Sequence, residues 1–174
     1  MEVNSFKVGE KAVHPAHGVG EVMGIEVRDI AGNRASFYVI KILETGTKVM
    51  VPVTAPESVG LRAIMSTTEA NKVLEVFRVD ERSVGSGPWN RRQRAYNEMI
   101  KSGSPYEVAK VLRDLYSIKF KNEKDLSYGE RRLMEQARGL LFREIALAKK
   151  VTESAIEEEI ANFFSPPAAV VAAS

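Results

Sequence analysis

The sequence has no cysteine, only two histidines and a single tryptophan among its 174 residues. The absence of cysteine excludes disulfides, thiolate nucleophiles and cysteine-ligated zinc. The formal net charge is only +2, so nucleic-acid binding would require a local basic patch. No apolar run is long enough to cross a bilayer, and the polar start of the chain has no apolar segment of the secretory type. We therefore expect a cytoplasmic protein without a membrane partner.

The composition is that of a folded protein, with 44% hydrophobic and 28% charged residues. The residue pattern changes from strand-like to helix-like near residues 61–66, which predicts two domains. We expect an α+β fold, with a β domain over residues 1–63 and an all-α domain of about five helices over residues 64–165. The small residues and prolines of residues 166–174 predict a disordered tail.

Strand-like segments rich in valine, isoleucine and aromatic residues occupy residues 6–53. Two glycine-containing separators, AGN at residues 31–33 and ETG at residues 44–46, are typical of three-residue hairpin turns. Glycines at tight bends favour a small open barrel.

Turns of three residues would place Ile40 opposite Met50 and Tyr38 opposite Pro52, on the same face as Arg28. The barrel interior would then consist of the odd-numbered residues Val27, Phe37, Val39, Val49 and Val51. The second apolar face could be covered by the helical domain, or a β-bulge could break this register. It could also be a partner surface rimmed by Arg28, because a polar-rimmed apolar face is typical of protein interfaces.

Capping boxes predict where four of the helices begin. In each box a serine caps the helix and a glutamate three residues later bonds back to it. The predicted caps are Ser66, Ser104 (with Pro105 at the first helical position), Ser127 and Ser154. A fifth helix is expected over residues 90–101.

The stretch GSGPWNRRQRAY, residues 85–96, contains Trp89 followed by Arg91, Arg92 and Arg94, with no acidic residue before Glu98. One interpretation is that Trp89 fastens the start of a helix to the core. The other is that the indole projects from the domain and unstacks a DNA base step while the arginines bind phosphates. Both interpretations stay open at this point.

Three phosphate contacts would give a salt slope of roughly −2.7, which is about a 40-fold loss of affinity between 50 and 200 mM salt. Three phosphate contacts alone would bind DNA weakly, so a second domain would have to hold Trp89 and the arginines near DNA at high effective concentration.

No catalytic site can be assembled from the remaining motifs. His14 and His17 lie in a glycine-rich turn, and no further histidine or cysteine is available to complete a metal site. The glycines of GVGEVMG lack the strand–turn–helix context of a dinucleotide loop. We expect a protein without catalytic activity, metal, cofactor or small-molecule substrate.

Three segments resemble a known family. FKVGEKAVHPAHGVGEVMGIE is similar to the opening of the CarD/CdnL family of bacterial transcription regulators. WNRRQRAY, followed by VAKVLRDLY and LSYGERRLMEQARGLL, is similar to the helical domain of that family. The resemblance covers about residues 6–164 and is closest to the CdnL type of myxobacteria.

The resemblance implies a Tudor-like N-terminal domain, similar to the polymerase-interacting domain of the transcription-repair coupling factor, that docks on the β subunit of RNA polymerase. It implies a helical domain whose Trp89 enters the minor groove at the upstream edge of the promoter bubble, with Arg91, Arg92 and Arg94 as DNA-contacting cations. The expected partners are therefore promoter DNA and the polymerase holoenzyme with its primary sigma factor.

The resemblance also places Arg28 and Met50 where the family meets the β subunit, so the residues expected to bind polymerase are Arg28, Tyr38, Ile40, Met50 and Pro52. Met50 would use apolar contact where other members use arginine, and His14 stands in place of a usual tyrosine. The competing hypothesis is an adaptor with two protein partners, in which Trp89 is buried and does not contact DNA.

Overall fold

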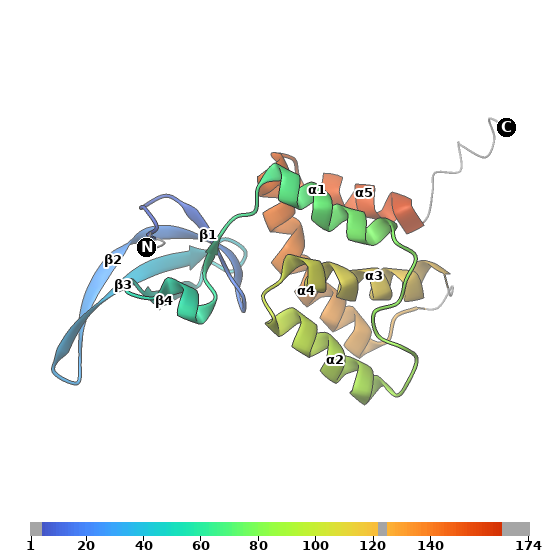
Figure 1. Cartoon of the computed structure of the whole chain (residues 1–174), viewed down its shortest axis with the longest axis horizontal. Helices are drawn as coiled ribbons and strands as arrows, with labels where there is room; N and C mark the ends of the chain where they lie inside the picture. Colours follow the sequence, from blue (N-terminus) through green and yellow to red (C-terminus); the bar gives the residue numbers. More distant parts are fainter. Residues whose placement is uncertain (1–4, 122–124, 165–174) are drawn as a thin grey trace. The chain divides into compact units, whose positions relative to one another are not determined.

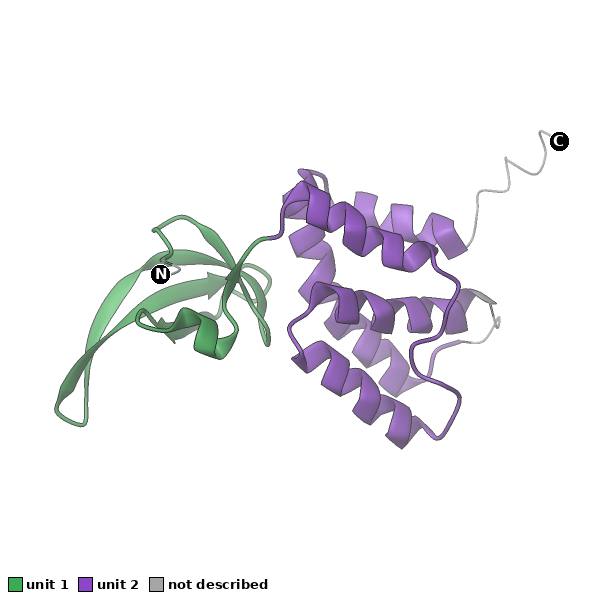
Figure 2. Ribbon diagram, in the orientation of Figure 1, with its two compact units in different colours: residues 1–64 green, residues 65–174 purple. Residues whose placement is uncertain are grey.

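The structure is a computed structural model that describes residues 5–121 and 125–164. The chain divides into two compact units, residues 1–64 and residues 65–174, which are coloured separately in Figure 2. The first unit is an antiparallel sheet and the second consists of helices (Figure 1). The predicted two-domain α+β fold, with a small Tudor-like β unit and a helical unit, is confirmed. The predicted disordered tail lies outside the described residues.

The first unit is one open sheet whose strands occur in the spatial order β4-β3-β2-β1-β5. All described pairings are antiparallel, so neighbouring strands can be joined by short turns. The strands are β1 (Lys11–His14), β2 (Gly18–Ile30), β3 (Asn33–Ile42), β4 (Lys48–Pro52) and β5 (Arg62–Ala63), with a short 3-10 helix η1 (Pro56–Val59) before β5.

Both hairpin turns differ in length from the prediction. Ala31 and Gly32 alone join β2 to β3, with positive φ angles of 51° and 82°, as a two-residue turn of type I′ requires. The β3–β4 turn closes where the Ile42 N–H donates to the Thr47 carbonyl at 2.8 Å, which leaves residues 43–46 between them. Each strand pairing is therefore displaced by one residue from the predicted register.

This displacement exchanges residues between the two faces of the sheet, because adjacent side chains point to opposite faces. Ile40 lies opposite Val49 and Tyr38 opposite Val51. Tyr38 is 2% exposed and Ile40 1% exposed, so both belong to the core of the sheet unit. The assignment of Phe37 and Val39 to the interior was wrong.

A β-bulge at Met23 also breaks the regular pairing of β2 with β3, since the register shifts between Val22 and Gly24. Beyond the bulge, Val27 is 60% exposed, so its predicted place in the interior was wrong as well. On the other side of the bulge, Gly20 faces Ile40 so closely that a Cβ would clash with its side chain. A glycine is needed at position 20 because the side chain of Ile40 from β3 packs directly against the β2 backbone there.

Five α-helices form the second unit in the part of the chain that the structure describes. They are α1 (Thr67–Glu75), α2 (Trp89–Lys101), α3 (Pro105–Lys121), α4 (Tyr128–Lys149) and α5 (Glu153–Phe164), with a 3-10 helix η2 (Val76–Arg78) after α1.

The capping prediction is confirmed for two helices. Ser66 accepts a hydrogen bond from Glu69 N, and Ser127 forms a complete capping box with Glu130. The predicted cap at Ser154 was wrong, because α5 begins at Glu153, two residues before the start that a cap at Ser154 implies. The hydroxyl of Thr152 caps this helix instead, accepting from Ala155 N at 3.1 Å.

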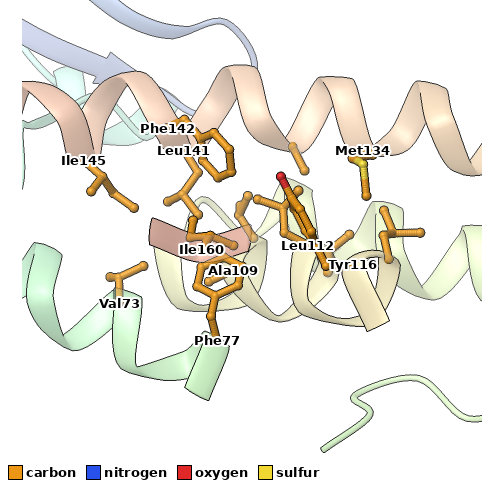
Figure 3. Close-up of a cluster of buried hydrophobic side chains, with 14 of the residues drawn as sticks. Val73, Phe77, Ala109, Leu112, Tyr116, Met134, Leu141, Phe142, Ile145 and Ile160 are labelled. Atoms are coloured by element: carbon orange, nitrogen blue, oxygen red, sulfur yellow. The ribbon is translucent and has the colours of Figure 1, made fainter. Parts of the chain in front are cut away.

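The helical core gathers side chains from every helix of the unit. Figure 3 shows how Val73 of α1 and Phe77 of η2 approach α3, α4 and α5. Leu112 of α3 and Ile145 of α4 are fully buried at its centre. This packing gives the N-terminal ends of α2 and α4 fixed positions, and the candidate site lies there.

Candidate functional site

Trp89 is the first residue of α2, directly after the N-cap residue Pro88. Its side chain is half-buried and packs against the edge of the helical core. The indole is therefore partly buried against the helices and partly exposed to solvent. Packing on the core and projection from the domain each describe part of its environment.

Gly129, in the first turn of α4, forms the surface against which the indole lies. A Cβ on this glycine would lie 2.8 Å from Trp89 Nε1, 2.9 Å from Cζ2 and 3.0 Å from Cε2. Only glycine permits this approach, because the clash would be with a bulky ring held at a helix start. The side of the indole that includes its N–H is thus turned toward the α4 backbone.

The guanidinium of Arg92 packs on the same indole, with Cζ 5.1 Å from the ring centroid. Arg92 Nε donates a hydrogen bond of 3.2 Å to the Gly87 carbonyl, and Nη1 lies 3.5 Å from Glu130 Oε2. The Arg92 side chain is only 16% exposed and that of Glu130 only 11%. Arg92 therefore joins the first turn of α2 to the first turn of α4.

The two carboxylate oxygens of Glu130 have different partners. Its Oε1 accepts from Ser127 N at 3.1 Å in the capping box, and its Oε2 faces Arg92. Burial alone would raise the pKa of this carboxyl, but the hydrogen bonds from Ser127 and the nearby Arg92 charge outweigh burial. The pKa of Glu130 therefore lies below its usual value of 4.5.

Arg91 and Arg94 differ from Arg92, because both are exposed and neither forms an ion pair with any residue of the described ranges. The three arginines that the sequence brings together are thus divided by the fold. Arg91 and Arg94 remain available to a polyanion, whereas Arg92 is already paired.

The segment before Trp89 is held in place by Asp114 of α3, which is fully buried. Its carboxylate accepts from Ser83 N at 2.9 Å, Val84 N at 3.0 Å and the Tyr96 hydroxyl at 3.1 Å. Burial, followed by the Asp114 charge, raises the pKa of Tyr96 to about 12. These bonds fix the approach of the chain to α2.

Sequence reasoning missed Asp114, Gly129 and Glu130 as parts of the site. Asp114 had a usable signal: it falls three residues after Val111 on the apolar stripe of its helix, where a carboxylate must find donors. Glu130 was recognised only as part of a capping box, and Gly129 had no signal of its own.

The second candidate surface is the outer side of the sheet, which we call the apolar sheet face. Met50 lies opposite Val39 and Pro52 opposite Phe37, and all four side chains are half-exposed. Arg28, paired with Glu26 at 3.1 Å, lies on this same side of β2, opposite Ala35. The rim is therefore charged, as expected for a partner surface.

Two residues assigned to this surface from the sequence do not belong to it. Tyr38 and Ile40 are buried on the other side of the sheet, and the Tyr38 hydroxyl accepts from Phe6 N at 3.1 Å. Phe37 and Val39 take their places because of the one-residue change in register. Arg28, Met50 and Pro52 lie on the side where they were expected together.

The two histidines lie side by side, with ring centroids 4.8 Å apart, and His14 Nδ1 accepts from Ala16 N. Among the described residues there is no cluster of three or more acidic or histidine side chains that could bind a metal. None of the helices in those same ranges combines the length and apolar character required to cross a membrane.

Comparison with known proteins assigns both units. Residues 6–65 match the CarD-like/TRCF RID domain, and residues 72–161 match the C-terminal domain of CarD. The chain belongs to the CarD/CdnL family. It is accordingly a transcription regulator of the CarD/CdnL type, as the resemblance in its sequence implied.

One curated relative of this CarD/CdnL chain is the protein named "Putative transcription factor YdeB" of Bacillus subtilis (strain 168). It is 29% identical over 152 residues, covering 87% of this chain and 97% of the relative.

Two solved structures from Myxococcus xanthus are similar to part of this chain. The structure titled CdnLNt is 56% identical and covers 38% of this chain and 93% of its own, with a TM-score of 0.31. The solution NMR structure of the 72-residue N-terminal domain of CarD is 34% identical and covers 34% of this chain and 79% of its own, with a TM-score of 0.30.

Proposed function

We propose that this transcription regulator binds RNA polymerase holoenzyme through the β subunit and stabilises the open promoter complex. In this proposal Trp89 inserts at the upstream edge of the transcription bubble. The protein acts on promoter DNA in the cytoplasm, with the primary sigma factor present in the holoenzyme, and has no catalytic role.

The observation that carries the proposal is the half-exposed indole at the start of α2, followed closely by Arg91 and Arg94, which are exposed and form no ion pair with the described residues. An aromatic ring at this position can stack on an unpaired base, and arginines beside it can hold the phosphates. The adaptor hypothesis requires a buried tryptophan, and the half-exposed ring does not favour it.

Two exposed arginines are a small DNA footprint, so the protein needs a second attachment. The apolar sheet face supports docking on polymerase, since it combines half-exposed apolar side chains with the charged Arg28 and Glu26 at its rim. Docking there would raise the effective concentration of Trp89 at the bubble without any further DNA contact.

We call the inserted indole of Trp89 the wedge. The wedge stabilises the open complex only if it binds melted DNA better than closed DNA. Stacking of an aromatic side chain on one base is worth about 1–3 kcal/mol. If the free energy of this stacking is gained only in the open complex, it lengthens the lifetime of that complex by about 5- to 150-fold.

The test is the lifetime of the open complex with Trp89→Ala, measured by a fluorescent base at the upstream edge of the bubble after competitor challenge. We expect a shorter lifetime within that range and unchanged co-purification with polymerase. Trp89→Phe, which keeps an aromatic ring, serves as the matched control and should retain part of the effect. An unchanged lifetime with folded Trp89→Ala would refute the wedge.

A further inference from the structure

The three arginines after Trp89 are not equivalent in the folded protein. Arg92 is bound on three sides, by the Gly87 carbonyl at 3.2 Å, by Glu130 at 3.5 Å and by the indole itself. Arg91 and Arg94 are exposed, and no ion pair joins either to the described residues.

The charge around Arg92 argues against a role in phosphate binding. Its guanidinium is already matched by the carboxylate of Glu130, and both side chains are largely buried. A phosphate approaching Arg92 would also approach that carboxylate, and like charges disfavour such an approach. Because the cation is paired inside the protein, it releases few counterions from DNA.

The position of Arg92 suits another task. The backbone of Gly129 lies against the edge of the Trp89 indole that carries the N–H, and the guanidinium of Arg92 packs on the ring. The N-cap residue of α2, Pro88, makes no side-chain capping bond, and the Arg92 bond to the Gly87 carbonyl steadies the backbone at this point instead. A ring that is held in one orientation before binding loses less conformational entropy when it binds DNA.

We infer that Arg92, Glu130 and Gly129 form a seat that fixes the indole of Trp89, and that Arg92 is a positioning residue and not a phosphate contact. This inference rests on the proposed function for its effect on transcription. The seat itself can be tested independently, because Trp89 is the only tryptophan in the chain and its fluorescence reports on that one ring.

The first experiment measures acrylamide quenching and steady-state anisotropy of Trp89 in the free, full-length protein. Arg92→Gln and Glu130→Gln should raise the quenching constant by about twofold and lower the anisotropy, because both changes remove the ion pair that holds the Arg92 guanidinium over the ring. Gln at position 130 can still complete the capping box, so loss of the helix cap does not explain the result. Arg91→Gln is the matched control and should leave both values unchanged.

Arg92→Lys separates charge from geometry. Lysine keeps the positive charge but cannot pack a planar group on the indole while bonding to both Gly87 and Glu130. We expect its quenching to resemble that of Arg92→Gln. Wild-type quenching and anisotropy in both Arg92→Gln and Arg92→Lys would overturn the inference.

The second experiment compares open-complex lifetimes over a range of KCl concentrations, with polymerase holoenzyme and each full-length variant. Removing a phosphate contact lowers the salt slope by roughly 0.9, which we expect for Arg91→Gln. Arg92→Gln should shorten the lifetime by about 2- to 10-fold at every salt concentration, the effect of ordering one side chain, without changing the slope. A slope reduced as in Arg91→Gln would overturn the inference.

The two experiments also distinguish this inference from the proposed function. If Trp89→Ala leaves the lifetime unchanged, the wedge fails, whereas the quenching data still decide whether the seat exists. If Trp89→Ala shortens the lifetime and Arg92→Gln does not, the positioning role of Arg92 is refuted although the wedge stands.

Discussion

The backbone of Gly129 lies directly against the indole of Trp89, so closely that a Cβ on the glycine would come within 2.8 Å of the ring nitrogen. The two residues are 40 positions apart in the sequence, and each stands in the first turn of its helix. The orientation of the indole therefore depends on the absence of a side chain in α4.

Gly129→Ala should displace the indole without weakening the helix. Alanine favours helix over glycine by about 1 kcal/mol, so α4 itself gains stability, but the new methyl group forces the ring to move. We expect a changed emission maximum of Trp89 and an open-complex lifetime shortened toward that of Trp89→Ala. Gly85→Ala, where a Cβ meets no atom within 4 Å, is the control and should resemble the wild type.

Met50→Asp should abolish co-purification with the polymerase β subunit. A carboxylate at the centre of the apolar sheet face would lose its hydration on docking, at a cost of about 2 kcal/mol or more, which is roughly a 30-fold loss of affinity. The control is Ile25→Asp, since Ile25 is 56% exposed on the opposite side of the same sheet. Unchanged binding by Met50→Asp would mean that another surface docks.

Much of the fold was predictable because each element carries its own local pattern. The periodicity of apolar residues and the serine caps located the helices to within a few residues, and Ser66 and Ser127 cap as predicted. The β2–β3 register was not predictable, because it depends on Ala31 adopting a φ of 51°, which alanine rarely does. The β3–β4 turn is also one residue longer than predicted, and this second change places Tyr38 and Ile40 on the side of the sheet away from Met50 and Pro52.

The candidate site was predictable only in part, for a related reason. Trp89 and its arginines are neighbours in the sequence, so their combination could be recognised directly. Their different environments come from α4, and the capping pattern of Glu130 gave no sign that the same carboxylate also binds Arg92. Contacts between distant segments therefore decide that Arg92 is the arginine paired within the described residues.

Asp114→Ala should destabilise the helical unit. The change leaves two partly buried backbone N–H groups and the buried Tyr96 hydroxyl without their acceptor, which costs about 3 kcal/mol. Urea unfolding followed by far-ultraviolet circular dichroism measures the loss. Glu98→Ala, at an exposed position of α2, should change stability by about 0.5 kcal/mol or less, and a similarly small change for Asp114→Ala would contradict its assigned role.

The lowered pKa of Glu130 predicts how the seat responds to acid. Since the folded pKa lies below the unfolded value near 4.5, the ionised carboxylate contributes stability that is fully present above about pH 4.5 and is lost as pH falls through the folded pKa. Wild type should therefore unfold at higher urea concentration than Glu130→Gln at pH 7, and this advantage should shrink progressively below pH 4.5. Glu135→Gln, an exposed change on the same helix, controls for general effects of removing a carboxylate. An advantage of wild type over Glu130→Gln that persists unchanged at pH 3 would show that the Glu130 charge does not stabilise this site.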